Sequence, residues 1–299
     1  MPISKQVTLA GRSVHRVGYG AMQLTDLDGF VVTPDQATAL LRAALAHGVD
    51  HIDTAEFYGH GALNRLLGRE LAHEDVILAT KIGARNDPRT RLRPAQRPAE
   101  LRAEVEANLA SLQVDRLDLV YLRRTDAPPG IIATGDQVVE LDDQLAELTT
   151  LRDEGKIAAL GLSNVSRAQL ESALDADITA VQNAHSLADR SSEDVLDACR
   201  GHDIAWVPYF PLGGNRPELV SVTTLPEVVT AAAELAVTPA QLGLAWQLHH
   251  YGQTLLIPGT RSLTHLTENM AVAEIELPQE ILTRLARTPE HIPAQPPAW

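Results

Sequence analysis

Residues 33–53, TPDQATALLRAALAHGVDHID, predict one helix followed by one strand. Thr33 can cap a helix N-terminus, and Pro34 suits the first helical position. Apolar residues then recur at helical spacing, at Ala37, Leu40, Leu41, Ala44 and Leu45. Gly48 ends the pattern, and residues 49–53 follow as a short strand. The stretch is therefore a helix with one apolar face, joined to a strand.

This helix-and-strand unit recurs along the chain. Strand-like runs occupy residues 16–20, 49–53, 76–81, 117–122, 158–163, 179–182, 204–209 and 254–258. Helical patterns lie between them, with apolar positions such as Leu101, Val105, Leu109 and Leu112, then Leu141, Leu145, Leu148 and Leu151. Later helices open at Thr238 and at Ser262. Eight strands alternating with helices over 299 residues predict an α/β fold, a (β/α)8 TIM barrel.

Three segments lie outside the repeat. Residues 7–14 predict a short N-terminal hairpin, 278–287 an extra C-terminal helix, and 291–299, with three prolines, a tail. An open doubly wound sheet is the alternative fold. Such a sheet would begin with a phosphate-binding loop of the pattern G-x-G-x-x-G. The two G-x-G segments that start at Gly18 and at Gly59 both lack the third glycine of that pattern. No linker divides the chain, so residues 1–299 are expected to form a single domain.

The composition excludes several classes of function. A formal net charge of −14 repels phosphates, so neither nucleic acid nor an anionic membrane surface is an expected partner. The single cysteine, Cys199, is expected to be a buried residue on a helix face. No signal peptide is evident and no apolar run is long enough to cross a bilayer, so a cytoplasmic enzyme is expected.

Three side chains at strand ends suggest acid–base chemistry. In such barrels the reactive groups sit where the strands end. Asp53 ends the second strand and Tyr58 follows it, while Lys81 ends the third. An ammonium beside a phenol favours the phenolate, and a carboxylate keeps the ammonium charged and oriented. The trio suits proton delivery to a carbonyl oxygen, although each residue taken singly has ordinary structural roles.

Several segments, in order along nearly the whole chain, resemble one family. They are GVDHIDTAEFYG at 48–59, GLSN at 161–164, VQN at 181–183, PYFPL at 208–212, and IPGT at 257–260 with the residues up to Asn269. Together they resemble the aldo-keto reductases. The resemblance implies hydride transfer from NADPH to a small carbonyl compound.

The resemblance also implies roles for individual residues. Asp53, Tyr58 and Lys81 match catalytic positions. Positions that match the cofactor site are Ser163, Asn164, Gln182, Tyr209, Leu212, Gly259, Thr260, Arg261, His265, Glu268 and Asn269. Of these, the first three would hold the nicotinamide carboxamide, and Tyr209 would stack beneath the ring. Arg261 is the candidate for the 2′-phosphate of NADP, with a solvent-facing arginine as the alternative.

The chain departs from the family pattern at the end of strand four. Family members usually carry His there, and this chain has Arg123. His265 also replaces a commoner Arg or Gln. With Phe210 and the residues after it, Arg123 resembles a bacterial branch that includes pyridoxal reductases. Arg123 could point into the site as a further catalytic residue and favour anionic substrates, or it could turn aside to pair with Asp53 or Glu56.

Three functions stay open on the sequence. The first is an NADPH-dependent aldehyde or ketone reductase. The second is a cofactor-binding auxiliary or regulatory barrel with little turnover, and the third is a biosynthetic enzyme for a tailored sugar or polyketide intermediate. No metal-binding motif occurs, and His249 and His250 are expected to mark a helix end. Specificity is expected in the loops at 123–137 and 213–224 and in a tail, 293–299, that covers the substrate. Neither the substrate nor the oligomeric state follows from the sequence.

Overall fold

Eight parallel segments form the wall of a closed barrel in the computed structural model, which describes residues 4–25, 31–128, 130–213 and 219–290. Seven of them pair in the order β11-β10-β9-β8-β5-β4-β3. Their bounds are Tyr19–Gly20 (β3), His51–Asp53 (β4), Ile77–Ile82 (β5), Leu117–Arg123 (β8), Ile157–Ser163 (β9), Ile178–Gln182 (β10) and Ala205–Trp206 (β11). The eighth segment joins the two edges through parallel bridges of Thr254 with Trp206 and of Leu256 with Val17. The predicted (β/α)8 barrel is confirmed.

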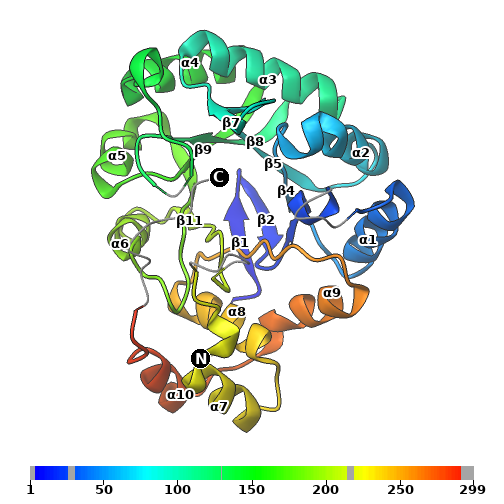
Figure 1. Ribbon diagram of the computed structural model, residues 1–299, viewed down its shortest axis with the longest axis vertical. Coiled ribbons are helices and arrows are strands. Elements are labelled where there is room, and N and C mark those ends of the chain that lie inside the picture. The colour runs from blue at the N-terminus through cyan, green and yellow to red at the C-terminus, as the bar shows by residue number, and fades with distance from the viewer. Residues whose placement is uncertain (1–3, 26–30, 129, 214–218, 291–299) are drawn as a thin grey trace.

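Helices surround this barrel (Figure 1). The ring consists of α1 (Pro34–Ala46), α2 (Ala62–Leu71), α3 (Pro98–Leu112), α4 (Leu141–Asp153), α5 (Arg167–Ser172), α6 (Glu193–Gly201), α8 (Pro239–His250) and α9 (Leu263–Met270). Outside it, α7 (Pro226–Glu234) packs against α10 (Gln279–Leu285), the predicted extra helix. Short 3-10 turns are η1 (Ala21–Leu24), η2 (Tyr58–Gly61), η3 (Gly135–Gln137), η4 (Leu174–Ala176), η5 (Val222–Thr224) and η6 (Ala271–Glu274). As expected, Thr33 caps α1, in a reciprocal pair of hydrogen bonds with Gln36.

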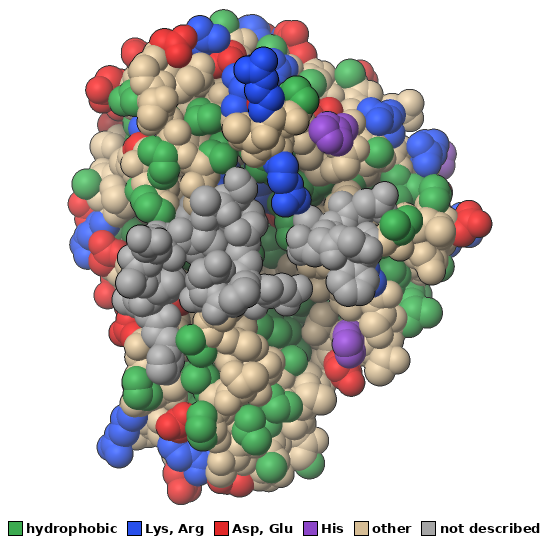
Figure 2. Space-filling view, in the orientation of Figure 1, with side chains coloured by type: hydrophobic (Ala, Val, Ile, Leu, Met, Phe, Trp, Pro, Cys, Tyr) green, Lys and Arg blue, Asp and Glu red, His purple; other side chains and the backbone are tan. Residues whose placement is uncertain are grey.

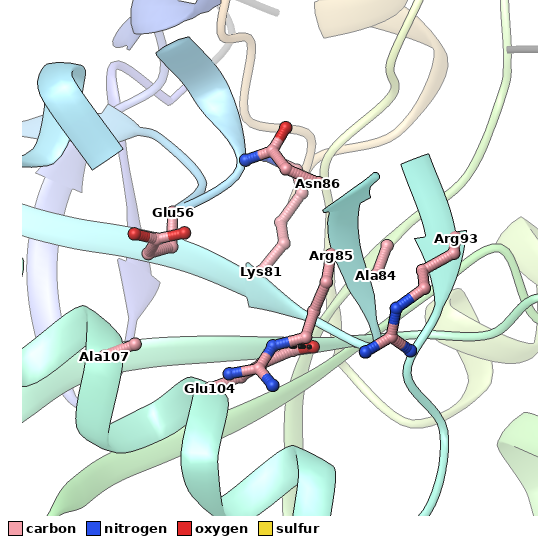
Figure 3. A pocket seen from close by; sticks show the side chains of 8 residues that line it. All are labelled: Glu56, Lys81, Ala84, Arg85, Asn86, Arg93, Glu104 and Ala107. Atoms are coloured by element: carbon pink, nitrogen blue, oxygen red, sulfur yellow. Dashed lines mark ion pairs between the residues drawn. The ribbon is translucent and has the colours of Figure 1, made fainter. Parts of the chain in front are cut away.

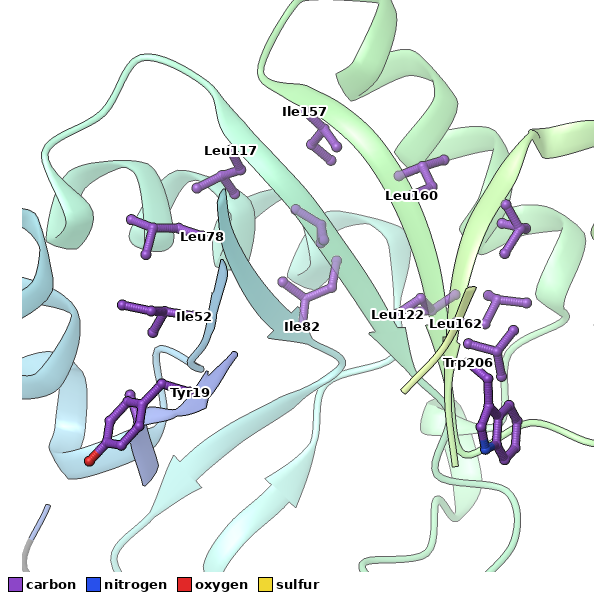
Figure 4. Packing of buried hydrophobic residues seen from close by; sticks show 14 of the residues in the cluster. Tyr19, Ile52, Leu78, Ile82, Leu117, Leu122, Ile157, Leu160, Leu162 and Trp206 are labelled. Atoms are coloured by element: carbon purple, nitrogen blue, oxygen red, sulfur yellow. The ribbon is translucent and has the colours of Figure 1, made fainter. Parts of the chain in front are cut away.

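Side chains along each strand alternate between the two sides of the barrel wall. Outward residues such as Ile52 and Leu160 pack beneath the helices (Figure 4). Inward residues such as Ile77 and Leu119 fill the barrel interior. Because both sides are covered, the strands are apolar at most positions up to their last residues.

Gly161 shows how closely the interior is packed. It lies on β9 directly opposite Tyr121 of β8. A Cβ atom at this position would lie 2.6 Å from the Tyr121 ring, which is too close for two carbon atoms. The glycine therefore lets an aromatic side chain fill the barrel just below the strand ends.

The predicted N-terminal hairpin closes the other end of the barrel. Strands β1 (Gln6–Leu9) and β2 (Arg12–His15) pair antiparallel, and Val7, Leu9 and Val14 join the interior apolar cluster. Next to the hairpin, buried Arg16 donates hydrogen bonds to the backbone oxygens of Leu248, Tyr251 and Thr254. The amino ends of the strands are thus sealed, and the opposite end is left for function.

The first, seventh and eighth strands are shorter than the sequence predicts. Residues 16–20 contribute only β3 and the bridge at Val17, and residues 204–209 only β11 and a bridge of Tyr209 with Ala184. The eighth segment makes isolated bridges alone. Pro208 and Pro258 have no backbone N–H to donate, which limits the ladder on this side of the barrel.

A second hairpin, which was not predicted from the sequence, follows β5. It consists of β6 (Ala84–Asp87) and β7 (Arg91–Pro94). Asp87 stabilises its turn by accepting backbone hydrogen bonds from Arg89 and Thr90. Because β5 runs toward the open end of the barrel, the hairpin lies over that end.

Cys199 lies on α6 and is fully buried, as expected. Burial raises the pKa of its thiol to about 12. A thiol that stays protonated is a poor nucleophile, so Cys199 serves packing.

No single helix in the described ranges is long and apolar enough to cross a membrane. Taken together, α7 and α8 have the length and composition of a membrane span, but the chain bends by 93° at the break between them. Within α8 the side chains of Leu242, Ala245 and Trp246 are buried, and His249 is partly buried.

Candidate active site

Five neighbouring strands carry a polar side chain at their last residue, or in β5 at the residue before it, at the open end of the barrel. These polar residues are Asp53 (β4), Lys81 (β5), Arg123 (β8), Ser163 (β9) and Gln182 (β10). In the parallel register Lys81 lies opposite Tyr121, an interior residue, and Arg123 lies opposite Ser163, which lies opposite Gln182. Residues opposite one another face the same side of a sheet, so these polar groups all face the barrel interior.

Asp53, Lys81 and Tyr58 meet in one group. The Lys81 ammonium donates to an Asp53 oxygen at 2.5 Å and to the Thr54 backbone oxygen at 3.0 Å. It also lies 5.2 Å from the centroid of the Tyr58 ring. Burial alone would lower the pKa of Lys81, but Asp53 and Tyr58 outweigh it, so the pKa is raised above its usual value. Lys81 therefore remains a cation beside the phenol.

Tyr58 is presented by a tight turn. It opens η2, where Gly59, His60 and Gly61 all have positive φ. A histidine in this left-handed region is uncommon, and such strain is held only where the surrounding structure requires it. The Gly61 amide donates to the backbone oxygen of Glu56 and closes the turn. Tyr58 thus returns toward the end of β4 although it is not part of a strand.

A buried polar network, missed from the sequence, supports the strand ends from outside the barrel. Thr54, after β4, donates to Asn64 of α2, and Thr80 of β5 donates to Asn108 of α3. The Asn64 amide donates to both Asn108 and Ser111. Each of these residues faces a helix and not the mouth. The network holds β4 and β5, and with them Asp53 and Lys81, in position.

Replacing Asn108 by Ala is expected to lower the free energy of unfolding by about 2–4 kcal/mol, because Thr80 and Asn64 each lose a buried partner. Urea unfolding would measure this as a lower midpoint with an unchanged slope. Asn86→Ala is the control, since Asn86 is only partly buried on β6 and has no described side-chain hydrogen bond. Equal midpoints for Asn108→Ala and the parent would contradict the role of the network.

Across the mouth, a second wall carries amides and an aromatic ring. Asn164 follows β9 with a φ of +59° and donates its side-chain amide to the backbone oxygens of Arg124 and Ala127. The Tyr209 hydroxyl donates to the Asn164 side-chain oxygen at 3.2 Å, and the Gln182 amide donates to Asp53 at 3.0 Å. Asn164 and Tyr209 line a cavity of about 560 Å³. Of the four residues predicted to bind nicotinamide, Asn164 contacts Tyr209, and Ser163 lies opposite Gln182, which contacts Asp53.

Adjacent arginines at the end of β8 face opposite ways. Arg124 points outward, where it donates to Gln144 of α4 and pairs with Asp126 at 2.9 Å. Arg123 faces the interior. Burial raises the pKa of the Tyr209 phenol to about 12, and the positive charge of Arg123 acts in the opposite direction. Arg123 therefore places a positive charge toward the mouth, where it acts on Tyr209.

The segment predicted to bind the cofactor phosphates lies between β3 and α9. Ser262 caps α9 by accepting from the His265 amide, and its own amide donates to the Thr260 hydroxyl. The Thr260 backbone oxygen accepts from buried Tyr19. Arg261 donates through Nε to the backbone oxygen of Gln23 in η1, at 2.9 Å. Arg261 thus lies next to the N-terminus of α9, and this arrangement is suited to binding phosphate.

The remaining predicted cofactor residues lie in three places. Gly259 approaches the Gly20 backbone so closely that a Cβ atom would lie 2.7 Å from its oxygen. Glu268 and Asn269 are partly buried on α9, where the Glu268 backbone oxygen accepts from Gln241. Leu212, after β11, accepts a backbone bond from Val222.

Known proteins with this arrangement share one family. The model of the Aldo/keto reductase family matches residues 16–288. Pyridoxine 4-dehydrogenase of Escherichia coli is 40% identical over 287 residues, which cover 94% of this chain and 97% of that protein. The chain belongs to the aldo/keto reductase family. It is an oxidoreductase, as the sequence predicted.

Solved structures of other aldo/keto reductases superimpose well on this one. An aldo/keto reductase from Klebsiella pneumoniae, described in complex with NADP and acetate, has a TM-score of 0.77 at 27% identity, with 95% of each chain covered. A second from the same organism, described in complex with NADPH, has a TM-score of 0.74 at 28% identity, covering 92% of this chain and 91% of that one.

This aldo/keto reductase has a further cavity, of about 300 Å³, beneath the β6–β7 hairpin (Figure 3). Lys81, Arg85, Arg93, Glu56 and Glu104 are among its lining residues. Glu104 of α3 is buried and accepts from the Gly83 amide. Burial raises the pKa of Glu104 to about 8, against the nearby charge of Arg85. The sequence carried one signal for this carboxyl, its spacing: Glu104 comes three residues after Leu101 and lies on the buried side of α3.

Figure 2 shows Lys and Arg side chains near the middle of the face turned to the viewer, although the whole chain carries a formal charge of −14. Arg85 and Arg93 on the second hairpin and Arg123 at the end of β8 bring positive charge to the open end of the barrel. Arg85 pairs with Glu104 at 3.5 Å and Arg93 pairs with Glu100 at 3.1 Å, so part of this positive charge is offset locally.

Proposed function

We propose that this enzyme reduces an aldehyde or ketone to an alcohol with NADPH, and that Tyr58 donates the proton. The observation that carries the proposal is the Asp53–Lys81–Tyr58 group, which faces Asn164, Gln182 and Tyr209 across the mouth. The two Klebsiella relatives, described with NADP and NADPH, support the choice of cofactor.

The residues present fit the nicotinamide half of the cofactor. Ser163, Asn164 and Gln182 supply hydroxyl and amide groups for its carboxamide, and Tyr209 supplies a flat face for its ring. When bound, NADPH supplies the hydride that reaches the carbonyl carbon. Arg261 and the N-terminus of α9 would hold its phosphates.

The chain's own residues supply the proton. The Tyr58 hydroxyl donates its proton to the carbonyl oxygen as negative charge develops there. Lys81, kept cationic by Asp53, stabilises the tyrosinate that remains. Tyr58 then regains a proton from water, which restores the starting state.

A screen of carbonyl compounds, followed by NADPH absorbance, tests the activity. Pyridoxal belongs in the panel because the Escherichia coli relative is named pyridoxine 4-dehydrogenase. Steady turnover of any panel member supports the reductase. An auxiliary or regulatory barrel would bind NADPH without turnover, and a biosynthetic enzyme would reduce a sugar or polyketide carbonyl but not small test aldehydes.

Removing Arg261 is expected to reduce a preference for NADPH over NADH. A charge-assisted hydrogen bond to the 2′-phosphate is worth about 1.5–3 kcal/mol, or roughly 10- to 150-fold in the ratio of dissociation constants. Fluorescence titration of Arg261→Ala with both cofactors measures that ratio. Arg284→Ala, on α10 and paired with Glu234, is the control. Equal affinity of the parent for the two cofactors would remove the basis of this assignment.

The expected substrate cover formed by residues 293–299 lies outside the described residues. The loops at 123–137 and 213–224 are expected to set specificity. In their described parts, Ala127, Pro128 and Gly213 line the larger cavity. We propose that these loops determine which carbonyl compound is accepted.

A further inference from the structure

Two histidines and one glutamate from three segments meet beside the larger cavity. His185 follows β10, Glu193 is the first residue of α6, and His250 is the last residue of α8. The Nε2 atom of His185 lies 3.0 Å from one Glu193 oxygen, and the Nε2 atom of His250 lies 2.7 Å from the other. One carboxylate is therefore shared by two imidazole rings.

Gln247 determines which nitrogen of His185 carries a proton. The Gln247 amide nitrogen donates to the His185 backbone oxygen at 2.7 Å, which fixes the orientation of the amide. Its oxygen then lies 2.9 Å from Nδ1 of His185 and must accept a hydrogen bond from it, so Nδ1 carries the proton. In neutral His185 the other ring nitrogen, Nε2, then has no proton, and its lone pair points toward a Glu193 oxygen. Two acceptors at 3.0 Å repel each other unless a cation lies between them.

The surroundings make the group rigid at one side and accessible at the other. His185 is only 1% exposed, and its ring contacts Trp206 edge-on and Trp246 face-on. Trp246 also stacks on His250, with ring centroids 4.6 Å apart. The side chains of Glu193 and His250 are 34% and 26% exposed, so an ion can enter from solvent.

We propose that His185, Glu193 and His250 bind a divalent transition-metal ion such as Zn²⁺. All three ligand atoms lie within 4.8 Å of one another. Ligands at about 2.0–2.2 Å from one zinc ion are separated by at most about 4.4 Å, so a small shift of His250 completes the site. Gln247 supplies the outer hydrogen bond that characteristically orients a histidine ligand.

No metal site was predicted from the sequence, because the three ligands belong to no spaced motif. His185 and His250 are 65 residues apart, and the tertiary fold alone brings them together. The ion would tie the start of α6 to the end of α8. It would lie next to Ala184, which follows β10 and forms a bridge with Tyr209. Binding of the ion does not depend on the reductase activity.

Calorimetric titration of the chelator-treated full-length protein with Zn²⁺ tests the proposal. We expect saturable binding of about one equivalent and a rise in Tm, because an ion that binds only the folded state stabilises it. His250→Gln should weaken binding by more than the roughly 10- to 100-fold that loss of an outer hydrogen bond costs. Glu193→Gln should do the same. His250 is partly exposed, so its replacement leaves the core intact.

His202→Gln is the matched control, because His202 is an exposed histidine at the end of α6. Its Zn²⁺ affinity should equal that of the parent. The proposal is overturned if the parent binds no Zn²⁺ saturably, which would leave a proton as the cation between His185 and Glu193. It is also overturned if His250→Gln binds like the parent, or if His202→Gln loses binding equally. Circular dichroism of the metal-free variants confirms that each is folded.

Discussion

Tyr58→Phe is expected to lower turnover by about 100-fold or more while leaving NADPH affinity nearly unchanged. The substitution keeps the ring and its edge-on contact with Phe57, at 5.1 Å between centroids, and removes only the hydroxyl. Lys81 and Asp53 remain paired, so the site keeps its charges but has no acid to donate the proton. Steady-state rates and a fluorescence titration of the cofactor separate the two effects.

Tyr251→Phe provides the control for this variant. Tyr251 is buried at the opposite end of the barrel, where its hydroxyl donates to the backbone oxygens of Cys199 and Ile204. Loss of that hydroxyl should affect stability and leave turnover close to that of the parent. Turnover of Tyr58→Phe comparable to the parent rate would exclude Tyr58 as the proton donor.

Arg123→Ala is expected to reduce kcat/KM by roughly 10- to 150-fold with carbonyl compounds that carry an anionic group, and by less with neutral aldehydes. The guanidinium is always charged and offers several donors in a rigid fork. It lies on the inward side of β8, opposite Ser163. A charge-assisted hydrogen bond to the substrate is worth about 1.5–3 kcal/mol, which corresponds to the expected factor.

Arg89→Ala is the comparison for Arg123→Ala, because Arg89 is an exposed arginine in the turn of the β6–β7 hairpin at the same end of the barrel. It tests whether any positive charge near the mouth has the same effect. Equal losses with anionic and neutral substrates in Arg123→Ala would rule out recognition of substrate charge. Unchanged kinetics with both would make Arg123 a structural residue.

Local patterns were sufficient for the barrel and for the positions of most strand ends. A helix such as α1 is defined by its cap, its apolar spacing and the glycine that follows its end, all within about sixteen residues. Alternation along β5 and β8 also determines that Lys81 and Arg123 face one side while Arg124 faces the other. Lengths of the strands near Pro208 were overestimated, because pairing depends on the neighbouring strand as well as on the strand itself.

By itself the sequence determined the repeated unit, the order of the strands and the polar residues that end them. The sequence also predicted that Asp53, Tyr58 and Lys81 form one group, and the structure brings the three together. The tertiary structure alone decided that Asn108 joins Thr80 to Asn64 and that Glu104 is buried. It also decided that His185, Glu193 and His250 meet. The physical reason is that backbone periodicity acts over a few neighbouring residues, whereas hydrogen bonds, ion pairs and burial depend on distances between segments far apart in the chain.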